Sequence, residues 1–302
     1  MNTDKGAPDL NKAPGASSVN DAHGGGDRTL GEIIRDTRNL SAEQVEKILV
    51  HQRAKHLRFG EAAIALGYVS ADDVLAALAQ QFNYPYATPE RRNLSPELVA
   101  LNQPFSVQAE AFRGVRSQVV MRTAEEGQVR HAIAVISPSR GDGRSFVAAN
   151  LAVVLAQLGG RTLLVDADLR GPRQHSIFGL DAATGLSRIL VGRAGGQVIQ
   201  QIAGVPNLYV LPAGAPPPNP LELIERPAFA LLLREMASKF DHVVVDTSAA
   251  EYGADAAVTA ARCGSTLMVA RNGRSRLDAL QALAQSLSGS AARVVGVITN
   301  DH

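Results

Sequence analysis

The sequence predicts an α/β protein in which a parallel sheet is flanked by helices and preceded by a small helical module and a disordered N-terminal tail. From about residue 130 onward, short apolar runs alternate with segments of helical periodicity, as in βαβ units. Between residues 29 and 81, apolar residues recur at helical spacing. Hydrophobic residues make up 45% of the chain and charged residues 20%, so a core can form and a fully disordered chain is excluded.

The N-terminal part divides into a tail and a repeat. Residues 1–28 are rich in Gly, Asp, Asn, Pro and Ser, and their few large apolar side chains cannot offset the entropy of ordering. Residues 29–82 contain two related copies, 29 residues apart, because Leu30-Gly31-Glu32 returns as Phe59-Gly60-Glu61 and Leu40-Ser41-Ala42 as Val69-Ser70-Ala71. Two copies are too few for a solenoid, so we expect a compact helical module with pseudo-symmetric halves and with Ser41 and Ser70 as N-caps.

Residues 83–106 are interpreted as a linker, because they contain four prolines and show little periodicity. Residues 107–302 are then the second domain. Its expected strands are 132–136, 162–165, 208–211, 243–245, 267–270 and 294–298. Its expected helices cover 107–121, a segment ending near 158, 229–240 and 277–287.

Charge and composition restrict the function classes. The chain has 30 basic and 29 acidic residues, so no global field attracts nucleic acid or an anionic membrane, and no nucleic-acid partner is expected. The single cysteine, Cys263, excludes an intramolecular disulfide and a cysteine-only metal cluster. There is no secretory leader and no apolar run of about 18 residues. We therefore expect a cytoplasmic protein that reaches a membrane only through a partner.

The loop after the first expected strand is a candidate phosphate loop. It reads Ser137-Pro138-Ser139-Arg140-Gly141-Asp142-Gly143-Arg144-Ser145 and leads into a helix. Glycines let backbone N–H groups approach an anion, the helix N-terminus adds its dipole, and a hydroxyl can reach Mg²⁺. The strict motif fails twice, because Pro138 replaces the first glycine and Arg144 replaces the lysine. A plain strand-to-helix turn is therefore an equal alternative for the loop alone.

Three acids follow expected strands at the same edge of the sheet. Asp166 and Asp168 follow one strand and Asp246 ends another, as the acid of a Walker B strand does. At the carboxyl ends of parallel strands, such carboxylates can hold Mg²⁺ or accept a proton. A turn or N-cap role is the ordinary alternative for any one of them, but three in register favour a functional site.

At these residues the chain resembles the bacterial tyrosine kinases (BY-kinases) of the wider MinD/ParA group of P-loop proteins, most nearly those of the EpsG-type chain-length-determinant class. Residues 110–116 are similar to the family's ExxRxxR oligomerisation motif, and 166–175 match its second Walker motif, called A′. The segments 212–223 and 240–255 agree as well. The resemblance covers about residues 107–300.

The resemblance implies ATP and Mg²⁺ as cofactors. The residues implied to bind nucleotide are Gly141, Asp142, Gly143, Arg144, Ser145, Phe146 and, for the adenine, Asn300. Those implied to hold Mg²⁺ are Ser145, Asp166 and Asp246, and those implied in catalysis are Arg144 together with Asp166 or Asp168, which would activate the tyrosine hydroxyl. Self-association into a homo-oligomer would use Glu110, Arg113 and Arg116.

The implied function is a MgATP-dependent tyrosine kinase that works with a membrane chain-length-determinant (Wzz-like) protein in exopolysaccharide biosynthesis and export, peripheral to the inner membrane. Three departures keep alternatives open. Arg144 stands for the Walker A lysine, Ser248-Ala249 stand for two prolines, and the C-terminal tyrosine cluster is absent, so another site or chain would be phosphorylated. The alternatives are a catalytically weak nucleotide-binding regulatory partner and a ParA-like positioning ATPase.

Two further segments have ordinary interpretations. Residues 58–81 resemble the N-terminal module of type II secretion and pilus ATPases, some of which bind cyclic di-GMP; a structural docking role is favoured over cyclic di-GMP binding. For Arg271, Arg274 and Arg276 a solvated charged face is favoured over contact with nucleotide or with a partner.

Overall fold

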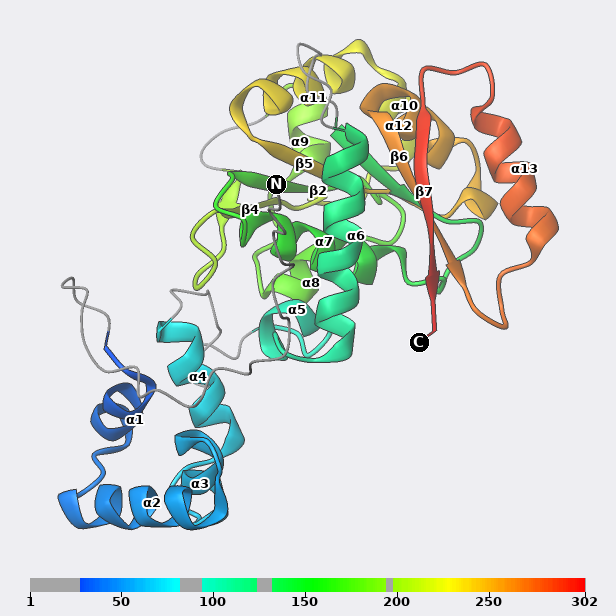
Figure 1. Cartoon of the computed structure of the whole chain (residues 1–302). Coiled ribbons are helices and arrows are strands. Elements are labelled where there is room, and N and C mark those ends of the chain that lie inside the picture. Colours follow the sequence, from blue (N-terminus) through cyan, green and yellow to red (C-terminus); the bar gives the residue numbers. More distant parts are fainter. Residues whose placement is uncertain (1–27, 82–93, 124–131, 194–197, 302) are drawn as a thin grey trace, which may run out of the picture.

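The computed structural model describes residues 28–81, 94–123, 132–193 and 198–301 (Figure 1). The expected tail, residues 1–28, lies outside these ranges except for its last residue. The predicted fold class is confirmed: a sheet of mostly parallel strands is flanked by helices, and four further helices precede it. None of the described helices is both long and apolar enough to cross a membrane.

The first four helices begin as the sequence repeat predicts. They are α1 (Leu30–Arg38), α2 (Ala42–Lys55), α3 (Phe59–Ala65) and α4 (Ala71–Gln81). Ser41 and Ser70 accept hydrogen bonds at their Oγ atoms, from the backbone N–H groups of Gln44 and Asp73, both at 3.2 Å, so both predicted N-caps are confirmed. These two N-caps are 29 residues apart, the period of the sequence repeat.

The two halves of this module pack across one another. Helix α1 contacts α4, and α2 contacts α3. A Cβ atom on Gly60 would lie 2.7 Å from Cγ1 of Val74, so the close approach of α3 to α4 requires glycine at this position. The module has a small apolar core of its own, formed by Ile33, Ile34, Ile48, Ala62, Ala63, Val69 and Ala77.

The sheet has seven strands in the order β3-β4-β2-β5-β1-β6-β7. Their bounds are β1 (Ala132–Ile136), β2 (Thr162–Asp166), β3 (Gln200–Gln201), β4 (Leu208–Leu211), β5 (His242–Asp246), β6 (Gly264–Arg271) and β7 (Arg293–Asn300). All neighbours are parallel except β3 and β4. The sequence predicted six of these strands. It missed β3, because two glutamines carry no apolar periodicity.

Helices cover both faces of the sheet. One core contains α5 (Val99–Asn102), α6 (Val107–Thr123), α7 (Arg144–Ala156) and α8 (Gln174–Phe178). The other contains α9 (Leu186–Leu190), α10 (Pro220–Glu225), α11 (Pro227–Lys239), α12 (Asp255–Cys263) and α13 (Leu277–Leu287). Helix α7 is buried along almost its whole length and contacts β1, β2 and β5, which fixes the loop before it.

Part of the expected linker is instead part of the core. Residues 94–106 include α5, and Leu98 and Leu101 are completely buried beside α7. Asn150 of α7 accepts a hydrogen bond from the Ala100 N–H at 3.0 Å and donates one to the Glu97 carbonyl at 2.9 Å. The prolines hid a short apolar run, residues 98–101, that pairs with α7. The linker interpretation is therefore wrong for residues 94–106, while residues 83–93 lie outside the described ranges.

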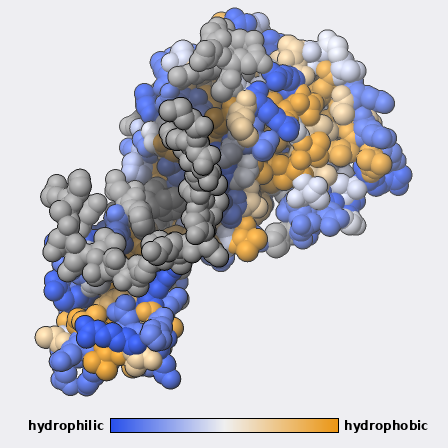
Figure 2. Space-filling view, viewed as in Figure 1, coloured by the Kyte–Doolittle hydropathy of each residue, from blue (hydrophilic) through white to orange (hydrophobic). Residues whose placement is uncertain are grey.

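Strand β7 forms one edge of the sheet and leaves apolar surface open. Among the described strands it pairs with β6 alone, and its Val294 and Val297 side chains are exposed. Figure 2 shows hydrophobic residues gathered on the surface over this region.

Candidate functional site

The loop between β1 and α7 has the backbone of an anion cradle. Gly141 and Gly143 have φ angles of +85° and +96°, in the left-handed region that side chains with a Cβ atom rarely adopt. A Cβ atom on Gly143 would also lie 2.0 Å from Nδ2 of Asn300. Gly143 provides no side-chain cap for α7, so the first N–H groups of this 13-residue helix are left for a ligand.

The loop is braced by Asp142 and Asn300. The buried Asp142 carboxylate accepts a hydrogen bond from the Ser139 N–H at 2.8 Å and another from the Ser275 hydroxyl at 2.7 Å. The amide of Asn300, at the end of β7, donates to the Asp142 carbonyl at 3.1 Å. The side chain of Asp142 therefore stabilises the loop from behind, in place of the nucleotide contact that the resemblance implies for it.

A cavity of about 1260 Å³ opens beside the loop. It brings together most of the predicted site residues, namely Gly141, Gly143, Arg144, Ser145, Phe146, Asp168 and Asn300. Four arginines that the sequence did not predict as site residues also line the cavity: Arg140, Arg170, Arg173 and Arg271. Asp166 and Asp246 are completely buried and are not among its lining residues.

The arginines after β6 correct one sequence interpretation. Arg271 donates to the Gly141 carbonyl at 3.1 Å, and the Arg274 guanidinium lies close enough that a Cβ atom on Gly141 would be 2.8 Å from its Nη1. These two residues therefore contact the phosphate loop and are not merely a solvated face. The sequence could have indicated this contact. Arg271 and Arg274 follow the expected strand 267–270, and the phosphate loop follows the expected strand 132–136. Parallel strands end at the same edge of a sheet, so both segments lie there.

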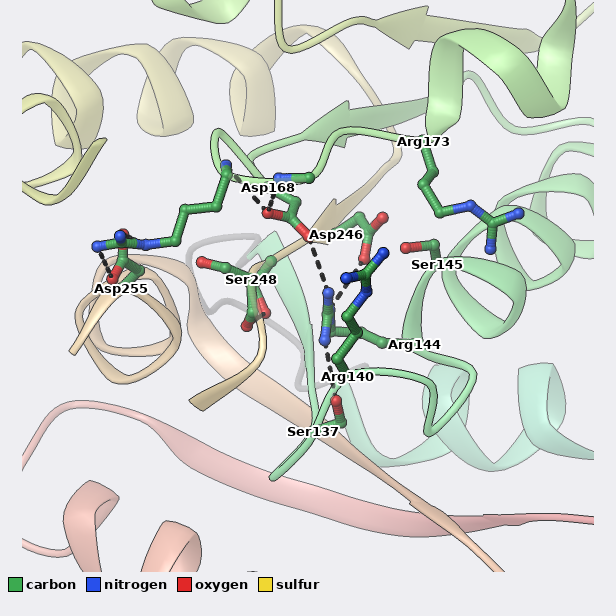
Figure 3. Close-up of polar contacts among 12 residues, drawn as sticks. Ser137, Arg140, Arg144, Ser145, Asp168, Arg173, Asp246, Ser248 and Asp255 are labelled. Atoms are coloured by element: carbon green, nitrogen blue, oxygen red, sulfur yellow. Dashed lines mark hydrogen bonds and ion pairs between the residues drawn. The ribbon is translucent and has the colours of Figure 1, made fainter. Parts of the chain in front are cut away.

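Arg144 turns its guanidinium to the acids of the site (Figure 3). Its Nη1 donates to the Ser137 hydroxyl and its Nη2 donates to Oδ2 of Asp168, each at 2.9 Å. Its Nε lies 3.5 Å from Oδ1 of Asp246, an ion pair without a hydrogen bond. The Arg144 side chain is only 8% exposed. The planar fork of arginine makes these three contacts possible at once.

Asp166 and Asp168 have different environments. Asp166 accepts backbone hydrogen bonds from Asp168, Arg173 and Gln174 at 2.9–3.2 Å. Burial, and then the charge of Asp246, hold the pKa of Asp166 well above its ordinary value. Asp168 lines the cavity and accepts N–H bonds from Arg170 and Gly171 besides its bond to Arg144. The structure therefore separates a positioning acid, Asp166, from one that reaches the cavity, Asp168.

Asp246 ends β5 behind the cavity. Its Oδ2 accepts a hydrogen bond from Nε2 of Gln174 at 2.8 Å, while its Oδ1 has no hydrogen-bond donor among the described residues. Burial raises the pKa of Asp246, and the nearby Arg144 charge opposes that rise.

Unpartnered polar atoms gather at this place. Of six buried side-chain atoms without a hydrogen bond in the described chain, four belong to Arg144, Gln174, Asp246 and Ser248. Such groups indicate room for a ligand, ion or water. Ser145, which lines the cavity, and Oδ1 of Asp246, which lies 3.5 Å from the Arg144 Nε without a hydrogen bond, supply oxygen atoms of the kind that Mg²⁺ takes, and the glycine cradle suits phosphate. The residues present therefore fit a nucleotide with its metal ion.

The loop after β2 is tied to α12 by an arginine. Arg170 forms a two-point ion pair with Asp255, with Nε–Oδ1 and Nη2–Oδ2 distances of 3.2 and 3.0 Å. Such paired contacts fix direction as well as distance. The tie therefore joins the loop after β2 to the first residue of α12.

The expected oligomerisation residues lie on α6, and none of them lines the cavity. Arg113 contacts Glu110 at 2.6 Å and also donates to the Pro104 carbonyl. Arg116 donates to the Val154 carbonyl of α7 at 3.2 Å. Glu110 has the most exposed side chain of this motif, at 73%.

Comparisons with known proteins agree with this geometry. Residues 128–193 match a family described as ParA, NUBPL iron-transfer P-loop NTPase. The tyrosine-protein kinase YwqD of Bacillus subtilis is 30% identical over 203 residues, which are 67% of this chain and 85% of YwqD. The tyrosine-protein kinase ptk of Acinetobacter johnsonii is 31% identical over 204 residues, but these span only 28% of that longer protein.

A solved structure gives the same result. The kinase domain of the Escherichia coli tyrosine kinase ETK superposes with a TM-score of 0.65 at 30% sequence identity, covering 71% of this chain and 84% of that one. The chain thus matches tyrosine kinases in both sequence and fold. Its cavity is lined by the phosphate loop between β1 and α7 and by Asp168 of the A′ motif. This chain belongs to the bacterial tyrosine kinases, within the ParA/MinD-like group of P-loop proteins.

Proposed function

We propose that the protein is an ATP-dependent tyrosine kinase that acts with a membrane chain-length-determinant (Wzz-like) protein in exopolysaccharide biosynthesis and export. It would work at the cytoplasmic side of the inner membrane, held there by that partner. The observation that carries the proposal is the position of Asp168: its carboxylate lines the same cavity as Gly141, Gly143 and Ser145 of the phosphate loop. A phosphate donor and a proton acceptor can thus share one space.

Residues of the phosphate loop, the cavity wall and the buried acids behind it have separate roles in the proposed reaction. The N–H groups at the start of α7 and the glycine loop would bind the phosphates, with Arg140 and Arg271 contributing positive charge at the cavity wall. Asp168 would orient the tyrosine hydroxyl and accept its proton. Ser145 and Asp246 would hold Mg²⁺, which neutralises charge on the transferred phosphoryl group when bound. Phosphoryl transfer depends mainly on such positioning and charge stabilisation.

One observation favours a second candidate, a nucleotide-binding regulatory partner with weak or no transfer activity. The carboxylate proposed as proton acceptor is bonded to Arg144 at 2.9 Å in a site where both side chains are at most 8% exposed. Both oxygens of this carboxylate already accept hydrogen bonds, Oδ2 from Arg144 and Oδ1 from the backbone N–H groups of Arg170 and Gly171, so neither is free to accept the tyrosine proton. Transfer requires this pair to loosen when substrate binds.

A phosphotyrosine assay by mass spectrometry distinguishes the two candidates. The full chain is incubated with MgATP, alone and with the cytoplasmic segments of the chain-length-determinant protein, and the same is done with Asp168→Asn. The control Asp36→Asn removes a carboxylate from an exposed ion pair, 3.1 Å from Arg35 and remote from the cavity in sequence. We expect the Asp168 variant to lose label by ~100-fold or more, as for loss of a general base, and the control to match the parent.

Either outcome is decisive. Label on tyrosine that requires Asp168 supports the kinase and identifies its target. If ATP binds but no tyrosine is labelled with or without the partner segments, the kinase proposal is wrong and the regulatory role stands.

A further inference from the structure

Arg144 places a fixed positive charge where three buried acids meet. Asp166, Asp168 and Asp246 are each at most 4% exposed, and they converge behind the phosphate loop. Carboxylates beside a phosphate loop repel the phosphates of a nucleotide, and a bound divalent cation commonly neutralises this repulsion. Here a guanidinium already contacts two of the three, Asp168 at 2.9 Å and Asp246 at 3.5 Å.

We propose that Arg144 replaces the divalent cation in nucleotide binding, so that this protein binds ATP about equally well with and without Mg²⁺. Mg²⁺ would then be needed for phosphoryl transfer only. This inference rests on the proposed nucleotide site, and it concerns a residue in which this chain departs from the usual phosphate-loop sequence.

The charges around the cavity support metal-free binding. Its lining contains five arginines and two acids, Glu97 and Asp168. Of these arginines, Arg173 is paired with Glu97 at 2.7 Å, and Arg170 is paired with Asp255. Arg140 has no acidic partner for its guanidinium in the described part of the chain, and Arg271 donates to a carbonyl. The cavity thus retains positive charge for the four negative charges of free ATP.

A lysine at this position would not act in the same way. Arg144 contacts Ser137, Asp168 and Asp246 from three different nitrogens, Nη1, Nη2 and Nε, and a single ammonium nitrogen cannot occupy all three positions. At least one of the two carboxylates that Arg144 contacts, Asp168 or Asp246, would lose its cation, and bound phosphate would then depend on a metal ion to neutralise it. Arg144→Lys should therefore create the metal dependence that the parent lacks.

Isothermal titration calorimetry with ATP tests this directly, in EDTA and in excess MgCl₂. We expect the Kd of the parent to differ by less than about threefold between the two conditions. For Arg144→Lys we expect binding at least ~10-fold weaker in EDTA than in MgCl₂, a difference of about 1.4 kcal/mol. The matched control is Arg35→Lys, which keeps the charge of a half-exposed, ion-paired arginine on α1, outside the residues that line the cavity, and should behave as the parent does.

The outcomes separate this inference from the proposed function. If the parent binds ATP in MgCl₂ but more than about threefold more weakly in EDTA, the role of Arg144 is overturned and the nucleotide site stands. If the folded parent binds ATP in neither condition, the proposed function itself is wrong. Thermal unfolding of each variant without nucleotide shows whether it is folded, and the result on the parent decides the inference even if Arg144→Lys does not fold.

Discussion

Gly143 and Asn300 form a contact that depends on the absence of a side chain. Gly143 has a φ angle of +96°, and a Cβ atom there would lie 2.0 Å from Nδ2 of Asn300, which holds the Asp142 carbonyl. Both the backbone and the close approach therefore exclude a larger residue. The last residue of the final strand thus fixes the loop after the first one.

Gly143→Ala should disrupt the loop. The left-handed backbone alone costs about 1–2 kcal/mol for alanine, and the displaced Asn300 adds to it. We expect weaker ATP binding by calorimetry and a lower denaturant midpoint. The control Gly114→Ala lies inside α6, where a Cβ atom meets nothing within 4 Å, and it should leave stability equal or up to ~1 kcal/mol higher. If Gly143→Ala binds ATP as the parent does, the loop geometry described above is wrong.

The acids show where residue-level prediction ended. Motif spacing selected Asp166, Asp168 and Asp246 correctly as neighbours, because parallel strands end at one edge. It could not distinguish Asp166, which accepts three backbone N–H bonds, from Asp168, which faces the cavity. That distinction depends on the path of the chain after β2. Asp168, two residues beyond the end of the strand, lines the cavity, whereas Asp166 does not.

At the scale of elements, strong periodicity predicted well and short elements did not. Helix α13 and strands β1 and β4 begin and end where their apolar residues predicted. The short helices α8, α9 and α10 were missed, since a window of five or six residues contains too little periodicity to identify a helix, and the nine-residue, alanine-rich α12 was missed as well. Helix α5 was hidden by the prolines around it, and tertiary contact with α7 makes it helical.

The assignment of α5 to the core can be tested by Leu101→Ala. Leu101 is completely buried, so its truncation should destabilise the protein by about 2–5 kcal/mol in urea unfolding, followed by fluorescence of an added label or by circular dichroism. Val107→Ala is the control, because Val107 is 88% exposed at the start of α6. If the two variants have equal urea midpoints, residues 94–106 are a linker and not part of the core.

At the scale of the whole molecule, α6 is the element through which we propose self-association. Arg113 and Arg116 already bond to carbonyl groups of their own chain, whereas the Glu110 side chain is 73% exposed. Glu110 is therefore the residue of this motif that is most open to a neighbouring copy.

Glu110→Lys should lower the assembled mass in sedimentation velocity with MgATP, because a reversed charge opposes a contact made by the carboxylate. Glu235→Lys on α11 is the control: it too reverses an exposed glutamate paired with a basic residue one turn away. A sedimentation profile of Glu110→Lys that is identical to the parent's would contradict association through this face of α6.

The sequence by itself determined the fold class, the phosphate loop, the three acids and the repeat of the N-terminal helices. These depend on local signals, namely apolar periodicity, glycine and capping residues, that act over a few positions. Only the tertiary structure decided that Arg144 turns to Asp168 and Asp246, that Arg140 and Arg271 line the cavity, and that residues 94–106 join the core. The direction of a long charged side chain, and the partner of a short apolar run, are set by residues distant in the sequence, which local pattern cannot specify.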